Sequence, residues 1–277
     1  MTPTSAAVFL DNEFSQVPDL IELYESYPYN VLRADLLRYL ILWYHGGYYA
    51  DMDVLPARPI KSCPSLGQLS SNPPTKEPAL VLGIEIDEPY ASPQLMHDWH
   101  WSRSYGFIQY NMYAPRRFSP LLRRAIVRVL SHTRQHQQHS SYFSHPRYDE
   151  STTLEITGPG VFTDAILDVL SETLPRTHPL ITKSLEKDEE ADELSRRPSG
   201  TSSRVTWAPF HRLKSPLWVD ASEATGGDMG GLGIMPISVW GNGQRHSEAG
   251  SFNHPLACIN HRFGRTWKKG WWEYLFG

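Results

Sequence analysis

The stretch LRADLLRYLILWYHGGYYADMDV, residues 32–54, decides the fold class of this chain. Leu32, Leu36, Leu40 and Tyr44 recur every four residues, the spacing of a helix face that packs on a core. The glycine pair that follows predicts the end of this helix, because glycine adopts a left-handed conformation there without steric cost. The next residues, YYADMDVLP, predict a short strand that ends at the two acids. A helix, a glycine stop and a strand in this order favour an α/β fold over a helical bundle.

The composition bounds the class of protein. The 277 residues are 40% hydrophobic and 20% charged, which suits one domain across residues 1–277. A formal net charge of -4 argues against a nucleic-acid partner bound through a basic field. Aromatic residues make up 12% of the chain, a content that fits surfaces for stacking on sugars or bases as well as aromatic cores. Cys63 and Cys258 predict either one disulfide in a lumenal protein or two buried thiols.

Membrane and secretion signals are weak in the chain as given. No apolar run approaches the roughly 20 residues of a transmembrane helix. The start, MTPTSAAVFL, lacks a basic region followed by a long apolar core, so it is a poor signal peptide. We therefore expect a soluble chain.

Four further segments predict regular elements. Residues 79–87, ALVLGIEID, predict a strand, and so do residues 231–240, GLGIMPISVW. Ser119 and Pro120 predict the N-cap and first position of a helix that runs to residue 132. In residues 155–170, EITGPGVFTDAILDVL, a Gly-Pro turn leads into another helix.

Three polar stretches predict surface loops. Residues 61–78 are rich in proline and serine, and residues 183–204 form a charged stretch that we expect to be mobile. Residues 131–152 are rich in histidine. Within them, His132 and His136 have the spacing of a zinc-binding pair, but no cysteine or acid partner is obvious, so we interpret the segment as a solvated loop.

Asp51 and Asp53 are the first candidates for chemistry. Two carboxylates one residue apart can bind Mn²⁺ or Mg²⁺ and leave coordination positions open for phosphate oxygens. The alternative is a pair of acids in solvent at the end of a strand. Asp35 and Arg38 lie three residues apart and therefore share a helix face. They are either a surface salt bridge or a pair that holds a sugar hydroxyl and a phosphate or sugar oxygen.

Residues 32–54 resemble the signature of glycosyltransferase family 32, whose members carry an Asp-x-Asp (DXD) motif. Other segments resemble this family in the same order along the chain, and together they cover about residues 9–269: VLGIEIDEP, WSRSYGFIQYNMYAPRRFSPLLRRAI, TGPGVFTDAI, IMPISVW, HPLACINHRF and TWK. The family includes the fungal initiation-specific alpha-1,6-mannosyltransferases, and the Gly-Pro-Gly element favours that branch.

The resemblance implies a GT-A fold, with a central mixed sheet flanked by helices, and a divalent metal, Mn²⁺ or Mg²⁺. It implies that Asp51 contacts the donor ribose or the metal, that Asp53 binds the metal and the diphosphate, and that His261 completes the metal site. Asp35 and Arg38 would contact the donor sugar.

Asp164 is the catalytic candidate that the resemblance implies. It would lie near the anomeric carbon, as a base toward the acceptor or as a stabiliser of an oxocarbenium-like state. The alternative role for Asp164 is a helix N-cap.

The resemblance also implies the reaction, which is transfer of mannose from GDP-mannose, with retention, to an N-glycan or another mannose-containing acceptor in the fungal Golgi lumen. The alternatives are transfer to inositol-phosphoceramide, use of a UDP-sugar, and an inactive member that serves as a binding subunit, for example in a glycosyltransferase complex. Two departures from the family are visible. The usual N-terminal strand and membrane anchor ahead of SAAVFLDNEF are missing, and HRFGRTWK stands where HHFEGSWK is expected.

Overall fold

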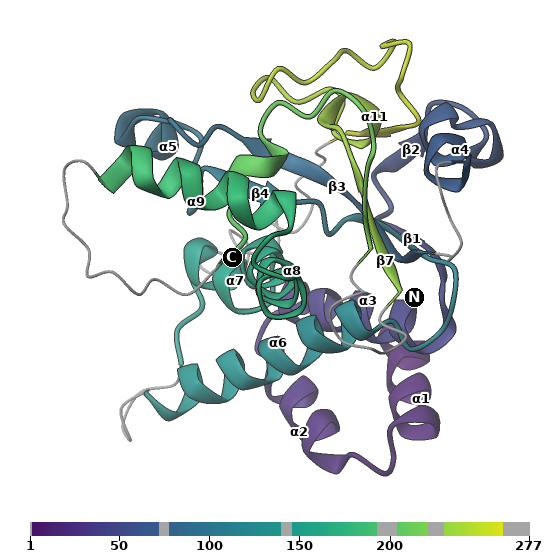
Figure 1. Ribbon diagram of the computed structural model, residues 1–277. Coiled ribbons are helices and arrows are strands. Elements are labelled where there is room, and N and C mark those ends of the chain that lie inside the picture. The colour runs from purple at the N-terminus through teal and green to yellow at the C-terminus, as the bar shows by residue number, and fades with distance from the viewer. Residues whose placement is uncertain (1, 72–77, 140–145, 193–203, 221–229, 263–277) are drawn as a thin grey trace.

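The computed structural model describes residues 2–71, 78–139, 146–192, 204–220 and 230–262 (Figure 1). A mixed sheet with the strand order β1-β5-β3-β7-β6 forms its centre, and β4 pairs with the second half of β3. Among the described strands of this sheet, β3 and β7 are the one parallel pair of neighbours. The strands of this sheet are β1 (Gly47–Ala50), β3 (Pro78–Asp87), β4 (Tyr105–Phe107), β5 (Asn111–Ala114), β6 (Leu217–Asp220) and β7 (Gly231–Met235).

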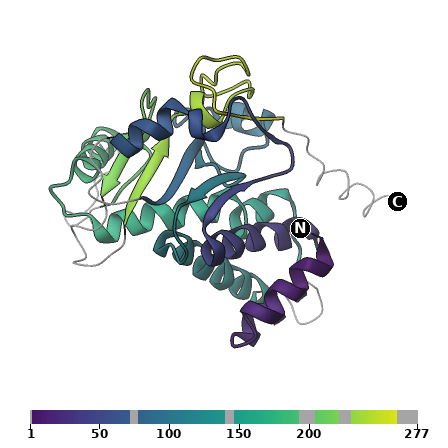
Figure 2. The same ribbon diagram turned by 90° about the vertical axis from the view of Figure 1, so that its right-hand side faces the viewer.

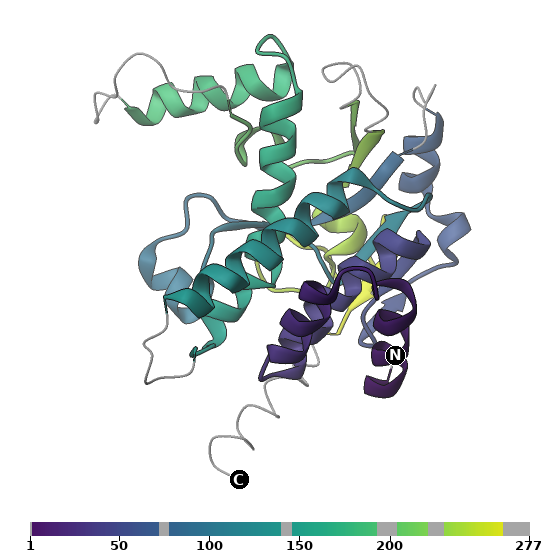
Figure 3. The same ribbon diagram turned by 90° about the horizontal axis from the view of Figure 1, so that it is seen from below.

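Helices cover both faces of the sheet. One face carries the larger helical layer, as Figures 2 and 3 show. This layer consists of α1 (Pro3–Glu13), α2 (Pro18–Ser26), α3 (Asn30–His45), α6 (Pro120–Gln138), α7 (Glu150–Ile156) and α8 (Pro159–Thr173). The opposite face packs on α4 (Pro64–Ser71), α11 (Ile237–Trp240) and a two-stranded sheet of β2 (Val54–Pro56) and β8 (Ile259–His261). The other helices in the described part of the chain are η1 (Ile60–Ser62), α5 (Pro93–Asp98), α9 (Pro179–Asp192) and η2 (Ala208–Phe210).

The central strand β3 shows why this sheet has two cores. Leu80, Leu82 and Ile84 face the larger helical layer, whereas Val81 faces α4 and α11. Side chains alternate between the two faces of a strand, so a continuous apolar run needs cover on both sides. This arrangement confirms the predicted strand and the predicted mixed sheet flanked by helices.

The helix, the glycine stop and the strand predicted from residues 32–54 are present in the structure. α3 ends at His45, and Gly46 and Gly47 have φ values of 67° and 93°. The expected strand is confirmed, because β1 ends at Ala50, directly before the two acids. A second strand, β2, begins after Asp53; β1 pairs with β5, whereas β2 pairs with β8 from the other end of the chain.

The three predicted loops contain helices, so these predictions are partly wrong. α4 lies within residues 61–78, and α6 continues to Gln138 through both histidines. α9 covers residues 183–192 of the stretch expected to be mobile, and residues 193–203 of that stretch lie outside the described residues. In residues 131–138 of α6, the buried side chain is that of Thr133, so this part of the helix lacks an apolar periodicity that would predict it.

Cys63 and Cys258 form a disulfide with a Cα–Cα distance of 5.5 Å. Of the two alternatives left open by the sequence, the disulfide is therefore correct. It joins the start of α4 to the residue before β8, and both half-cystines are buried. A crosslink across so long a loop restricts the unfolded chain, an effect worth about 5 kcal/mol in the chain-entropy description.

Within the described residues, every helix is too short or too polar to cross a lipid bilayer.

Candidate functional site

Asp35 and Arg38 form a buried ion pair on α3. Arg38 Nη1 lies 3.0 Å from Asp35 Oδ1, and the two side chains are only 8% and 3% exposed. Thr157 Oγ1 donates to Asp35 Oδ2 at 2.8 Å, and Gln109 Nε2 donates to Asp35 Oδ1 at 3.3 Å. Burial raises the pKa of Asp35 to about 6, although Arg38 acts in the opposite direction. The surface salt bridge that the sequence left open is therefore wrong, because α7 and the segment after β4 cover this face of the helix.

Arg38 links this pair to the first acid of the DXD motif. Its Nη2 lies 3.4 Å from Asp51 Oδ2, and the Tyr49 hydroxyl donates to Asp51 Oδ1 at 2.7 Å. The Arg38 guanidinium also lies 5.7 Å from the centre of the Tyr49 ring. One buried arginine thus joins Asp35 inside the protein to Asp51, which is 26% exposed at the end of β1.

The second acid of the motif contacts the predicted histidine. His261 Nε2 lies 3.2 Å from Asp53 Oδ1, because Val54 and His261 face each other across the β2–β8 pair. The His261 ring stacks on Tyr110 with a centroid distance of 4.1 Å. Burial lowers the pKa of His261, so its imidazole is neutral at pH 7, the form that binds metals.

The donor set fits a divalent cation in part. A carboxylate and a neutral imidazole suit Mn²⁺. Among the described residues, however, no group of three or more His, Cys, Asp or Glu side chains is arranged to hold a metal. The three-residue cluster expected from Asp51, Asp53 and His261 is thus not assembled. Asp53 and His261 come together, but Arg38 and Tyr49 hold Asp51. Met52 between the acids is 98% exposed, so the turn is open to solvent.

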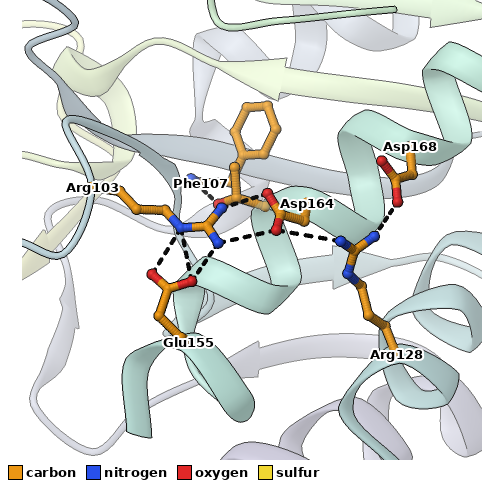
Figure 4. A network of polar contacts seen from close by, with 7 residues as sticks. Arg103, Phe107, Arg128, Glu155, Asp164 and Asp168 are labelled. Carbon is orange, nitrogen blue, oxygen red and sulfur yellow. Dashed lines mark hydrogen bonds and ion pairs between the residues drawn. The ribbon is translucent and has the colours of Figure 1, made fainter. Parts of the chain in front are cut away.

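Asp164 belongs to a second group of charges, shown in Figure 4. Arg103 Nη2 donates to Asp164 Oδ2 at 3.0 Å, and Arg103 Nε donates to Glu155 Oε1 at 2.8 Å. Arg128 contacts Asp164 at 3.4 Å and also pairs with Asp168. The alternative role of Asp164 as an N-cap is wrong, since the Gly-Pro turn starts the helix earlier and Gly158 is the N-cap of α8.

The turn between α7 and α8 connects the two groups. Glu155 in α7 binds Arg103, and Thr157 after α7 binds Asp35. A Cβ at Gly158 would lie 2.8 Å from Leu154 Cα, so only glycine allows this close turn. The Gly-Pro-Gly element therefore sets the positions of both groups of charges.

Comparison with known proteins shows similarity to glycosyltransferases. Residues 5–71 match the family described as "Glycosyltransferase sugar-binding region containing DXD motif". The chain is similar to the initiation-specific alpha-1,6-mannosyltransferases of Saccharomyces cerevisiae and Candida albicans, with 26% and 24% identity. Each of these alignments covers 94% of this chain. Through residues 5–71 and these alignments, the chain is similar to glycosyltransferases that carry a DXD motif.

The chain spans 68% of the length of the Saccharomyces relative and 60% of that of the Candida relative. Among solved structures, it is similar to the PaToxG glycosyltransferase, with 18% identity and a TM-score of 0.35 over 65% of this chain and 50% of that one.

Near the DXD motif, Glu85 is a charged residue that the sequence reasoning missed. It lies between Ile84 and Ile86, where the register of β3 against β4 shifts. Such a bulge redirects a side chain and is common beside active sites. Burial raises the pKa of the half-buried Glu85 to about 7; Arg38 lowers it and Asp51 raises it further. An acid inside the apolar run ALVLGIEID was the signal that could have revealed it.

Glu85 and Asp51 lie at the same edge of the sheet. β1 and β3 are both antiparallel to β5, so they run in the same direction and end at this edge. Two hydrogen bonds extend this arrangement through the residues just before β5. The Asp51 N–H, after β1, donates to the Tyr110 carbonyl, and the Ile108 N–H donates to the Gly83 carbonyl in β3. The carboxyl ends of strands are the usual ligand sites of α/β sheets.

Proposed function

We propose that this chain transfers mannose from GDP-mannose, with retention of configuration, to a mannose-containing glycan, and that it requires a divalent cation. The observation that carries this proposal is the position of the DXD motif. Asp51 and Asp53 lie at the carboxyl end of β1, next to a buried arginine and opposite a neutral histidine. The similarity to alpha-1,6-mannosyltransferases over 94% of the chain supports mannose as the sugar and the fungal Golgi as the location.

Asp53 and His261 would hold the cation, Mn²⁺ or Mg²⁺. When bound, the cation neutralises charge on the departing diphosphate and acts as a Lewis acid. Asp51 would approach the cation or the donor ribose from the other side of the turn. Its contact with Arg38, 3.4 Å long, is loose enough to be exchanged for a ligand contact.

Arg38, Asp35 and Glu85 would recognise the donor. Arg38 can donate to a phosphate or sugar oxygen, since charge-assisted bonds of this kind are strong. Asp35 is almost inaccessible, and its oxygens already accept from Arg38, Thr157 and Gln109. We therefore assign it the orientation of Arg38, in place of the direct sugar contact that the resemblance implies. Glu85 at the same edge would accept a hydrogen bond from a sugar hydroxyl.

For Asp164 the catalytic role stays a prediction. Its ion pairs with Arg103 and Arg128 favour a positioning role instead, in which it fixes the loop before β4 against α8. The two roles differ in what an isosteric substitution would change, so kinetics and stability measurements can separate them.

Product analysis tests the proposed reaction. Purified protein with Mn²⁺ is supplied with GDP-mannose, UDP-glucose or UDP-galactose, together with an α-mannoside or an inositol-phosphoceramide acceptor. We expect metal-dependent transfer from GDP-mannose to the mannoside with α-linked product. Transfer from a UDP-sugar would show that the proposed donor is wrong. Transfer to inositol-phosphoceramide but not to the mannoside would show that the proposed acceptor is wrong. If no donor is consumed but GDP still binds with metal, the chain is instead an inactive binding subunit.

A further inference from the structure

An aromatic cluster lies beyond the carboxyl end of β3, separate from the DXD group. Trp99 and Trp101 stack with a centroid distance of 5.6 Å and an interplanar angle of 17°. His246 packs edge-on against both indoles, at 5.1 Å and 4.6 Å. Burial lowers the pKa of His246 to about 4, so at pH 7 the imidazole is neutral and packs as an aromatic ring. Both tryptophans remain partly exposed to solvent.

A second aromatic cluster lies beside the same strand end. Tyr90 contacts Trp207 at 5.5 Å and His211 at 5.8 Å, and these two rings are 5.6 Å apart. Tyr90 is 67% exposed. A tyrosine that is held by other rings yet open to solvent offers an apolar face at little entropic cost.

Two acids at the end of β3 hold both clusters. Asp87 Oδ1 lies 2.8 Å from His211 Nδ1, and the Asp87 N–H donates to Ser247 Oγ at 2.9 Å. Ser247 Oγ in turn lies 2.9 Å from His246 Nδ1, and the Ser247 N–H donates to Glu88 Oε1 at 2.6 Å. Through these shared anchors, both clusters are fixed to the end of β3.

Backbone strain concentrates at this surface. Within the described residues, five non-glycine residues have positive φ angles, and four of them belong here: His100, Arg212, Ser247 and Glu248, with φ between 52° and 58°. Each such conformation costs roughly 1–3 kcal/mol and persists where the surrounding structure enforces it, commonly at ligand sites.

The polar groups at this surface suit a saccharide. Arg212, Lys214 and Glu248 form ion pairs beside the rings and can exchange hydrogen bonds with sugar hydroxyls. A cavity of about 50 Å³ lies among Asp87, Arg212 and Glu248. It has room for a few water-sized groups but not for a sugar ring. Rings would therefore lie on the aromatic side chains, with a substituent in the cavity.

The aromatic side chains are also connected to the proposed donor site through β3 and Gln244. Asp87 follows Glu85 by two residues on β3, which corresponds to about 7 Å along a strand. Gln244 Nε2 donates to the Glu85 carbonyl at 2.6 Å, so the segment that carries His246 and Ser247 also fixes the bulge at Glu85. The aromatic side chains and Glu85 are thus both held at the end of β3.

We propose that the aromatic surface formed by Tyr90, Trp99, Trp101, Trp207, His211 and His246 binds the acceptor, a mannose-type oligosaccharide, by stacking its pyranose rings on the exposed aromatic faces. This inference rests on the proposed function, since it assigns the acceptor side of the same reaction.

Binding of linear α-mannotriose tests the proposal without donor or metal. Calorimetric titration of the wild type, Trp99→Ala and Tyr90→Ala gives the Kd of each. We expect the substitutions to weaken binding by about tenfold or more, the effect of losing one good aromatic contact. Tyr90 is so exposed that its truncation leaves the fold intact. Phe118→Ala, at another exposed aromatic residue, is the matched control and should bind like the wild type.

The outcome can be separated from that of the proposed function. Asp53→Ala should lose metal-dependent GDP binding but keep mannotriose binding. Trp99→Ala should keep metal-dependent GDP binding but bind mannotriose more weakly. Unchanged mannotriose Kd values in both aromatic variants would overturn the proposal, as would a wild type that binds GDP with Mn²⁺ but not mannotriose. If mannotriose binds normally while GDP does not bind, only the proposed transfer reaction fails. Binding of inositol-phosphoceramide vesicles but not mannotriose would overturn the choice of a glycan.

Discussion

Two arginines on this scaffold each bridge two carboxylates, yet their surroundings differ. Arg38 joins Asp35 to Asp51 with its side chain only 8% exposed, whereas Arg103 joins Glu155 to Asp164 with its side chain 33% exposed. Water screens the second group, and its contribution to stability is correspondingly small. The first group is desolvated, so removing one partner leaves a buried charge without compensation.

The difference in burial between the two groups indicates which of them belongs to the functional site. The Arg38 group opens at Asp51 into the solvent-exposed DXD turn, while the Arg103 group ties the loop before β4 to two helices. Strong electrostatics in a partly dry environment serve ligand binding and catalysis better than a screened pair does. The following predictions test this contrast, from the largest expected effect to the smallest.

Asp53→Ala should give the largest effect. It removes the carboxylate opposite His261 but no core side chain, so metal-dependent hydrolysis of GDP-mannose should fall by about a thousandfold or more while the fold is retained. Hydrolysis rates and thermal unfolding of the variant measure these two properties. Asp11→Ala, at an exposed acid of α1, is the control and should behave as wild type. Normal hydrolysis in the Asp53 variant would refute the metal assignment.

Arg38→Gln and Arg103→Gln compare the two arginines directly. Loss of Arg38 should lower the free energy of unfolding by about 3–5 kcal/mol, since Asp35 stays buried without its partner. Loss of Arg103 should cost about 1 kcal/mol or less. Urea denaturation of both variants measures the difference. Equal losses would show that burial does not separate the two groups.

The pH dependence of stability tests Glu85 and Asp35. Burial raises the pKa of Glu85 to about 7 and of Asp35 to about 6, both above their unfolded values. The folded state therefore binds more protons than the unfolded state, and stability falls as pH rises from about 4 to 7. At pH 8 in EDTA, Glu85→Gln should be more stable than wild type by about 1–3 kcal/mol and show a shallower pH profile. A profile identical to wild type would contradict the burial of this charge.

Asp164→Asn should give the smallest effect. We expect a stability loss of about 1 kcal/mol, because screened ion pairs to Arg103 and Arg128 are weakened, and a kcat within about threefold of wild type. Urea denaturation and steady-state kinetics measure both. A fall of about a hundredfold in kcat at unchanged stability would instead establish Asp164 as a catalytic base or stabiliser.

Local signals could be read from the sequence, whereas long-range contacts could not. The periodicity of α3, the glycines after it and the Ser119 N-cap involve neighbouring residues, and all are confirmed. β2 exists only because it pairs with β8, which no local pattern indicates.

The site shows the same division. The DXD pair followed from its local spacing, and His261 from the resemblance to a family. By contrast, the arginine partners of Asp164, the bulge at Glu85 and the aromatic surface depend on segments far apart in the chain.

Calorimetric titration of GDP with and without Mn²⁺ tests the central claim most directly, namely that the DXD turn beside Arg38 and His261 is a metal-dependent nucleotide site. We predict GDP binding that requires Mn²⁺, is stronger than UDP binding and is lost in Asp53→Ala. GDP binding of equal strength without metal, or none under either condition, would contradict it.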